Sequence, residues 1–180
     1  MKNNKGYLLL ESIMSLSIIG TLLIVIYISL IFCIESKTSI EDKVEIQQQA
    51  LEMTKHIKST IEKSKGIISV TYNNLNIEDN FKGVTSIKCK YKGKDDLSNV
   101  SIKNKEISYK KSSKKLFINT LNSKNQSESG GYEIGDYVEN IYVYRHDNEK
   151  FLTIKLRLRK NNQTYENQFK VFIRNFEEEY

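Results

Sequence analysis

The sequence predicts an α+β protein in which one long N-terminal helix packs on an antiparallel β-sheet. Two observations support this fold class. Residues 7–65 contain no Pro and a single Gly, and their apolar residues recur at helical spacing. Beyond Gly66 the apolar residues alternate with polar ones, at the period of a β-strand. The 180 residues suit one domain with an appendage.

The first half of the predicted helix is apolar on all sides. From Ser12 to Ile34 the chain contains no Asp, Glu, Lys, Arg or His. At 1.5 Å per residue, a helix of that length covers roughly 34 Å, which is enough to cross a bilayer core. Lys2 and Lys5 precede the segment and favour a cytoplasmic N-terminus. We therefore expect a single-pass membrane protein whose residues beyond Ile34 lie outside the cell.

Two kinds of cleaved signal fit this segment poorly. A secretory signal ends in a small-x-small cleavage site, and a lipoprotein signal has small residues before its Cys. Here bulky Ile31 and Phe32 precede Cys33, and no Ala lies nearby. Cys33 and Cys89 are far apart in the chain, so we expect no disulfide, no metal site and no cofactor.

Glu11 argues against a plain membrane anchor. Insertion scales assign an acid a free-energy cost of about 2.5–3.5 kcal/mol at the centre of a membrane helix, and a smaller cost near its end. An acid that stays in such a segment is expected to have a partner, because pairing offsets the cost of removing its charge from water.

The residues around Glu11 resemble the processing site of type IV prepilins and pseudopilins. The matching run is Lys5-Gly6-Tyr7-Leu8-Leu9-Leu10-Glu11-Ser12, followed by an uninterrupted apolar segment that contains Gly20. In that family a short basic leader ends in Gly, and Glu is the fifth mature residue. The motif covers about the first thirty residues. Tyr7 stands where Phe or Met is more usual, and no Pro follows Gly20, whereas many major pilins have one.

The resemblance implies a processing pathway. A prepilin peptidase would cut between Gly6 and Tyr7 and methylate the new amine of Tyr7. Because Gly6 has no side chain, we expect its backbone to lie extended against the protease. Cleavage there leaves the apolar segment intact, and Glu11 could neutralise the Tyr7 amine of a neighbouring subunit and so set the helix register.

These features predict a structural subunit and not an enzyme. Its expected role is that of a minor pilin, which is membrane-anchored before assembly into an extracellular type IV pilus. Its partners would be the prepilin peptidase, other pilin subunits and the inner assembly platform. A pseudopilin of a type II secretion or competence DNA-uptake machine is the alternative within the family. An anchored surface-binding protein is the alternative from another class, and it would keep its leader.

The expected organisation has four parts. Residues 1–6 form the leader, 7–34 the membrane or filament-core half of the helix, 35–65 its amphipathic half, and 66–180 the sheet domain. The helix itself is expected over residues 8–65. An apolar stripe on the amphipathic half should pack on the sheet, and it comprises Ile40, Val44, Leu51, Ile57 and Ile61.

The alternation after Gly66 predicts several antiparallel strands. Residues 138–144, 151–159 and 164–173 should form a meander with polar turns at 145–150 and 160–163. Residues 68–72 and 87–91 also alternate, and residues 112–137 should be loop around one strand at 115–121. The meander resembles that of the larger minor pilins and pseudopilins of the J or W type.

Basic residues alternate on two of the predicted strands and could contact DNA phosphates or another anionic surface. They are Lys88, Lys90, Lys92 and Lys94 on one strand, and Lys155, Arg157 and Arg159 on the other. A solvated sheet face explains the same alternation and is the favoured interpretation. Asp95, Asp96, Asp136 and Asp147 lack the loop spacing of a calcium site. His56 and His146 have no catalytic partner at a diagnostic spacing.

Overall fold

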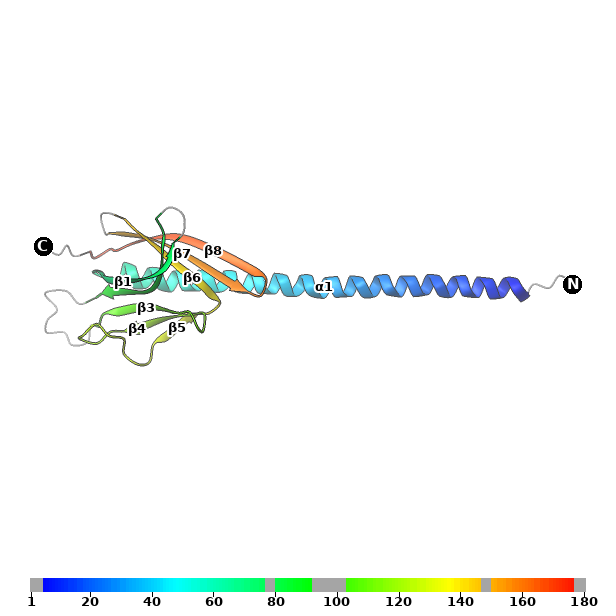
Figure 1. Cartoon of the computed structure of the whole chain (residues 1–180), viewed down its shortest axis with the longest axis horizontal. Coiled ribbons are helices and arrows are strands. Elements are labelled where there is room, and N and C mark those ends of the chain that lie inside the picture. The colour runs from blue at the N-terminus through cyan, green and yellow to red at the C-terminus, as the bar shows by residue number, and fades with distance from the viewer. Residues whose placement is uncertain (1–4, 77–79, 92–102, 147–149, 177–180) are drawn as a thin grey trace. The chain divides into compact units, whose positions relative to one another are not determined.

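The computed structural model describes residues 5–76, 80–91, 103–146 and 150–176 (Figure 1). The chain divides into two compact units, Met1–Glu41 and Asp42–Tyr180, and each is described here by itself. Helix α1, Lys5–Glu62, passes through both units. It has the predicted length of 58 residues, but it begins and ends three residues earlier than predicted.

The end of α1 is fixed by local hydrogen bonds. The Ser64 backbone N–H donates to the Ile61 carbonyl at 3.0 Å, and its hydroxyl donates to the same oxygen at 2.7 Å. These bonds tighten the last turn and satisfy a carbonyl that the helix leaves free. The next N–H, of Lys65, donates to the Lys90 carbonyl at 2.7 Å, so the chain passes directly from helix to sheet.

Eight strands form one antiparallel sheet in the second unit. They are β1 Gly66–Asn76, β2 Lys82–Lys90, β3 Lys105–Lys110, β4 Lys115–Thr120, β5 Tyr132–Gly135, β6 Val138–Arg145, β7 Phe151–Lys160 and β8 Gln163–Phe172. The strand order is β5-β4-β3-β2-β6-β7-β8, and β1 pairs with β2. Strand β2 joins the two halves, because residues 86–89 pair with β3 while Lys82 and Gly83 pair with β6.

The predicted meander is confirmed as β6, β7 and β8, which pair antiparallel in sequence order. The β7–β8 turn falls at 160–163 as predicted, and Lys160 pairs with Gln163. Residues 147–149 of the other predicted turn lie outside the described residues. The prediction for residues 112–137 is wrong in part, since β5 forms there in addition to β4. Strand β3 was not predicted at all.

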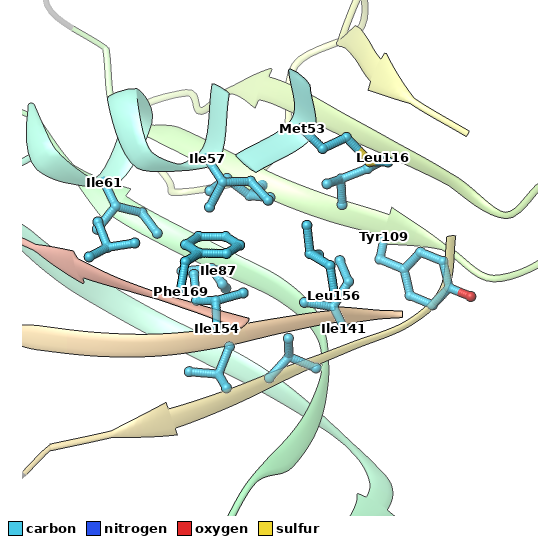
Figure 2. Close-up of a cluster of buried hydrophobic side chains, with 14 of the residues drawn as sticks. Met53, Ile57, Ile61, Ile87, Tyr109, Leu116, Ile141, Ile154, Leu156 and Phe169 are labelled. Atoms are coloured by element: carbon cyan, nitrogen blue, oxygen red, sulfur yellow. The ribbon is translucent and has the colours of Figure 1, made fainter. Parts of the chain in front are cut away.

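The core lies between one face of the sheet and one stripe of α1 (Figure 2). The helix contributes Ile46, Ala50, Met53, Ile57 and Ile61, each no more than 1% exposed. Side chains from the seven strands β2 to β8 complete this core, among them Ile87, Tyr109, Leu116, Ile141, Ile154, Leu156 and Phe169. The sheet approaches the helix closely at Gly135, where an added Cβ would lie 2.6 Å from Cγ of Met53.

The predicted helix stripe is therefore wrong for three of its five residues. Ile40, Val44 and Leu51 are exposed by 62%, 45% and 62%, whereas Ile57 and Ile61 are buried. The reason is geometric. At 100° per residue, Leu51 and Ile57 differ by 240°, so the predicted set mixes two faces of the helix. The face that packs on the sheet follows the spacing Ile46, Ala50, Met53, Ile57 and Ile61.

The two cysteines are unpaired, as predicted. Cys33 is exposed on α1, and Cys89 is fully buried in the core. Burial raises the pKa of the Cys89 thiol to about 12. Because the thiolate is the reactive form, Cys89 acts as a small apolar side chain.

Two substitutions on α1 distinguish the observed packing face from the predicted one. Ile57→Ala removes a buried side chain and should lower the free energy of unfolding by about 2–5 kcal/mol. Leu51→Ala removes an exposed one and should change it by less than about 0.5 kcal/mol. The measurement is urea unfolding of a soluble form comprising residues 36–180. Equal losses for the two variants would contradict the assignment of the packing face.

Candidate functional site

The predicted processing residues lie in the first turns of α1. Gly6 and Tyr7 follow the first helical residue, Lys5, and Glu11 lies one turn further on. The backbone of Gly6 is thus helical in the structure, and the extended form is expected only against the protease. The side chain of Tyr7 is 74% exposed. The structure places Gly6, Tyr7 and Glu11 together at one end of the apolar segment.

The apolar half of α1 has no protein partner in its own unit. Between Tyr7 and Ile34, twenty large apolar side chains are exposed, from 40% for Ile31 to 74% for Tyr7. The segment is long and apolar enough to cross a membrane, with a mean hydropathy of 2.7 over its most apolar window. Fully burying one such side chain contributes about 1.5–3 kcal/mol, so this surface requires lipid or other helices to cover it.

Three hydroxyl groups of this half bond to the backbone of the helix itself. Ser12 donates to the Leu8 carbonyl and Ser29 to the Val25 carbonyl, each at 2.8 Å. Thr21 donates to the Ile18 carbonyl, also at 2.8 Å. A hydroxyl bonded to its own backbone does not need water, which lowers the cost of placing it in an apolar environment. Ser12, Thr21 and Ser29 are therefore compatible with burial in an apolar environment.

Glu11 differs from these residues. It is the only Asp or Glu between Tyr7 and Ile34, and it is exposed. Among the side chains that the structure describes, none forms an ion pair or hydrogen bond with Glu11. If lipid or helices cover this segment, the carboxylate must find its counter-charge outside the described part of its own chain, or lose its charge.

The basic stripe on β7 is balanced by acids on neighbouring strands. Lys155 and Arg157 both form ion pairs with Glu166 of β8, the first at 2.9 Å, and Arg159 lies 3.5 Å from Glu139 of β6. The buried partners on the opposite face of β7 are Leu152, Ile154, Leu156 and Leu158. The stripe thus lies on the sheet face opposite the core, with its charge largely offset.

The stripe on β2 is separated from the one on β7 by β6 in the strand order. Lys88 donates from Nζ to the Asn125 carbonyl at 2.8 Å, and the Lys90 side chain or backbone also has a partner. Lys92 and Lys94 lie outside the described residues. The described lysines of this strand are therefore engaged in holding neighbouring segments, and the structure does not join the two stripes into one cationic surface.

A polar cluster that the sequence did not reveal ties α1 to the β7–β8 turn. Lys160 Nζ lies 3.0 Å from Asp42 Oδ1 and 2.6 Å from Glu45 Oε2. Asn161 donates from Nδ2 to Asp42 Oδ2 at 2.7 Å, and its φ of 49° is one that Asn tolerates better than most residues. We refer to Asp42, Glu45, Lys160 and Asn161 as the clasp.

The clasp shifts the ionisation of its members. The hydrogen bonds from Asn161 and Lys160 hold the pKa of Asp42 below its ordinary value of 3.8. The hydrogen bonds from Lys160 and Tyr137 lower the pKa of Glu45 below 4.5. Those from Glu45 and Asp42 raise the pKa of Lys160. All three groups are thus stabilised in their charged forms at neutral pH, which indicates a structural lock between helix and sheet.

A second polar cluster holds residues 122–128 against the sheet. Glu106 of β3, 6% exposed, accepts hydrogen bonds from the hydroxyls of Ser86 and Ser127 and from the Asn119 amide. Burial alone would raise the pKa of Glu106, but these hydrogen bonds and the charge of Lys88 hold it below its ordinary value. Every oxygen of this buried carboxylate has a partner, so the cluster explains its burial without a ligand.

The remaining candidates gain no catalytic partner among the described residues, although His146 Nε2 lies 3.0 Å from Thr153 Oγ1. His56 packs edge-on against Tyr132, and His146 against Tyr144 and Phe151. Asp95, Asp96 and Asp147 lie outside the described residues. Within the described parts of the chain, no group of three His, Cys, Asp or Glu side chains is placed to hold a metal ion. Asp136 Oδ1 is buried and has no hydrogen-bond partner.

No family of known proteins matches the chain, and no curated protein or solved structure is significantly similar to it.

The clasp should make stability depend on pH in a defined direction. Asp42 and Glu45 have lowered pKa values in the folded state, so the unfolded chain binds protons first as the pH falls. Their contribution is present above about pH 5 and is lost as the pH falls through their folded pKa values. Asp42→Asn with Glu45→Gln should therefore lower the Tm at pH 7 and flatten its decline between pH 6 and 3.

Thermal unfolding of residues 36–180 at several pH values measures this effect. Glu41→Gln is the matched control. Glu41 is adjacent in sequence, but its pair with Lys37 is long, at 3.6 Å, and both side chains are more than 60% exposed. This control should keep the wild-type pH profile. A wild-type profile in the clasp variant would show that these ion pairs do not contribute to stability.

Proposed function

We propose that this chain is a type IV pilin-like subunit, cut after Gly6 and assembled through the apolar half of α1 into a filament. Before assembly, that half anchors the protein in the cytoplasmic membrane, with the sheet domain outside. The prepilin peptidase that cuts the leader would also methylate the amine of Tyr7. The sheet domain and residues 42–62 of α1 then form the part that faces the medium.

One observation carries this proposal: Glu11 is the one Asp or Glu between Tyr7 and Ile34, and no described side chain pairs with its carboxylate. Membrane lipid alone would cover the apolar side chains, so their exposure also fits a plain anchor. Lipid offers no fixed cation at the depth of Glu11, however, whereas a neighbouring subunit cut at Gly6 offers the new amine of Tyr7. The pair would be strong in a low-dielectric interior and would penalise any helix register that separates its members.

The missing Pro supports a minor role within the family. Residues 20–41 are helical without interruption, and Ile28 stands near where many major pilins have Pro. A pseudopilin of a secretion or DNA-uptake machine would use the same Gly6, Tyr7 and Glu11 in the same way. An anchored surface-binding protein would use neither the cleavage nor the pairing, and it would keep residues 1–6.

Cleavage is tested most directly at Gly6. The peptidase must approach the backbone at this position closely, and a Val side chain would add bulk there. Gly6→Val should therefore keep its leader. The readout is the intact mass of the membrane-extracted protein after co-expression with a cognate peptidase. The wild type should begin at Tyr7, and Leu8→Val serves as the control for a side-chain change that leaves Gly6 in place. A variant at position 6 that is cleaved normally would refute the assigned site.

Assembly is tested at Glu11. Removing this carboxylate makes insertion of the segment easier, so Glu11→Ala should insert and be cleaved normally. It should nevertheless fail to assemble, because leaving one charge of a buried pair alone costs on the order of 3–5 kcal/mol. Glu11→Gln should give an intermediate level, since it keeps the shape and one hydrogen bond but not the charge.

The measurement is the ratio of sheared extracellular protein to membrane-retained protein, with cleavage checked in the same sample. Normal extracellular levels for Glu11→Ala would make the residue a passive interfacial acid. A loss that is fully explained by failed cleavage would instead make Glu11 part of the peptidase recognition motif alone.

A further inference from the structure

Strand β8 lies at one edge of the sheet (Figure 1). It is ten residues long and follows β7 at the end of the strand order. The chain contains no Pro, and the pairing of β7 with β8 proceeds without a register shift. Pro and β-bulges are two of the devices that prevent an edge strand from pairing with another chain. Strand β8 has neither of them.

Two hydrogen bonds show which backbone groups of β8 face this edge. The Arg159 N–H of β7 donates to the Tyr137 carbonyl at 2.8 Å, on the β6 side, whereas the Lys150 carbonyl accepts from the Ile173 N–H at 3.0 Å, on the β8 side. Consecutive residues of a strand point their N–H and C=O groups in opposite directions. Even-numbered residues of β7 therefore bond to β8, where their partners are odd-numbered. The even-numbered residues of β8 point their backbone groups away from β7.

Five residues of β8 thus direct both backbone groups outward, namely Thr164, Glu166, Gln168, Lys170 and Phe172. Their side chains are exposed, and none of their outward N–H and C=O groups has a hydrogen-bond partner among the described residues. Just beyond them, the Arg174 N–H donates to the Glu62 carbonyl at 3.2 Å, and the end of α1 closes the edge. A row of unpaired N–H and C=O groups is a template for an added strand.

Helix α1 runs beside β8 for the length of the strand. Three hydrogen bonds place it there, one before the strand, one near its middle and one after its end. They join Asp42 to Asn161, Thr54 to Asn167 and Glu62 to Arg174. A groove of about 520 Å³ is lined by α1 residues 51–63, Thr54 among them, and by Arg174. The groove therefore lies on the side of α1 that borders β8.

The lining of this groove combines cations with apolar surface. Its charged residues are Lys55, Lys58, Glu62, Lys63 and Arg174. The single acid among them is bound by Arg174, whose Nη2 lies 3.0 Å from its Oε2. Leu51 is 62% exposed and adds the apolar surface. Side chains that complement this lining are acidic, or apolar where they meet Leu51.

The spacing of the groove residues suits an extended chain. Side chains on one face of a strand lie about 6.6–6.8 Å apart. Lys55 follows Leu51 by one helical turn, which is about 6 Å along the axis of α1. Both residues line the groove. Alternate side chains of a strand placed outside β8 can therefore meet successive groove residues, while the backbone of that strand bonds to β8.

We propose that β8 is a docking edge for an extended acidic segment of another polypeptide. The segment adds a strand antiparallel to β8, and its inward side chains, acidic and apolar, enter the groove. Main-chain hydrogen bonds supply the affinity, and the groove supplies the specificity. A second copy of this chain is the weaker candidate, because pairing two β8 strands would bring two cation-rich grooves together. This inference does not depend on the proposed assembly into a filament.

Hydrogen–deuterium exchange tests whether the edge is open in the full chain, solubilised in a neutral detergent. With residue-resolved mass spectrometry, the amides of Glu166, Gln168 and Lys170 should exchange at least about tenfold faster than those of Asn167 and Phe169, which bond to β7. Slow exchange of the outward amides would overturn the proposal, since another segment would already cover them. A dimeric mass in the same sample would identify that segment as a second copy.

A synthetic peptide that alternates Thr with Glu and Leu is the probe for docking. It should bind the full chain, slow the exchange of the outward amides and bind more weakly at high salt. In an antiparallel pair, opposed residues that bond to each other have their side chains on the same face. The Thr residues of the peptide should therefore bond to β8, while Glu and Leu enter the groove.

N-methylation of the peptide separates main-chain pairing from adhesion by charge. Methylation of the Thr amides removes the donors that face β8, so it should abolish binding. Methylation of the Glu and Leu amides changes the peptide equally but leaves those donors intact, so it should preserve binding. Equal binding of the two methylated peptides would overturn the proposal.

Gln168→Pro tests the edge from the side of the protein. The Gln168 N–H points away from β7, so Pro removes an outward donor without breaking a bond between β7 and β8. The variant should bind the peptide at least about tenfold more weakly, and Gln168→Thr, which keeps the N–H, should bind like the wild type. Wild-type affinity in the Pro variant would overturn the proposal. The methylated peptides decide the same question on the wild-type chain, even if the Pro variant does not fold.

Charge variants test the groove. Lys55→Glu should weaken binding of the peptide at least about threefold, because it places an acid against the inward Glu side chains. Lys111→Glu makes the same change at an exposed position outside the groove and is the matched control. Equal affinities for these two variants would overturn the assigned position of the peptide.

Discussion

The packing of one stripe of α1 on the sheet is the constraint on which the rest of the structure depends. Ile46, Ala50, Met53, Ile57 and Ile61 complete a core that the strands cannot close alone. The stripe starts only after Asp42, where the second unit also begins. Within the second unit, the helix packs on the sheet through this stripe. The clasp lies at this transition, where polar groups of α1 first meet the sheet domain.

The distribution of charged side chains in the sheet domain follows from which face of each element packs on the core. On the outer sheet face, cations and acids alternate on neighbouring strands, and antiparallel register places Arg157 opposite Glu166. Such cross-strand pairs each contribute little to the free energy of unfolding, but they balance the positive charge of β7 with negative charge on its neighbours. On α1 the buried stripe leaves its polar residues on the remaining faces, and their register is set by the core. Lys55, Lys58 and Lys63 therefore share a groove with Glu62, whose carboxylate is bound by Arg174.

The sequence was sufficient for the features that repeat along the chain and insufficient for those that depend on distant residues. Strict alternation located β6, β7 and β8, and the Asn-rich turn fixed the register of β7 and β8. Strand β5 has four residues and lies in a Gly- and Ser-rich region, so its pattern was too short to detect. The helix face was misassigned because apolar residues occupy two faces between Ile40 and Ile61. The clasp joins residues more than a hundred positions apart, and no local pattern relates Asp42 to Asn161.

The polar side chains in the N-terminal half of α1 differ in whether they have a hydrogen-bond partner. Ser12, Thr21 and Ser29 each bond a carbonyl of their own helix, so these three hydroxyls need no external partner. Glu11 carries a full charge and has no such bond among the described side chains, which is the feature that would distinguish an assembly element from a lipid anchor. A lipid anchor gains nothing from an acid in its first turns, whereas an assembly element gains a register. The charge limits which helix alignments are tolerated, while the apolar side chains favour close packing in any alignment. In the proposed filament, specificity and adhesion would therefore come from different residues of this helix.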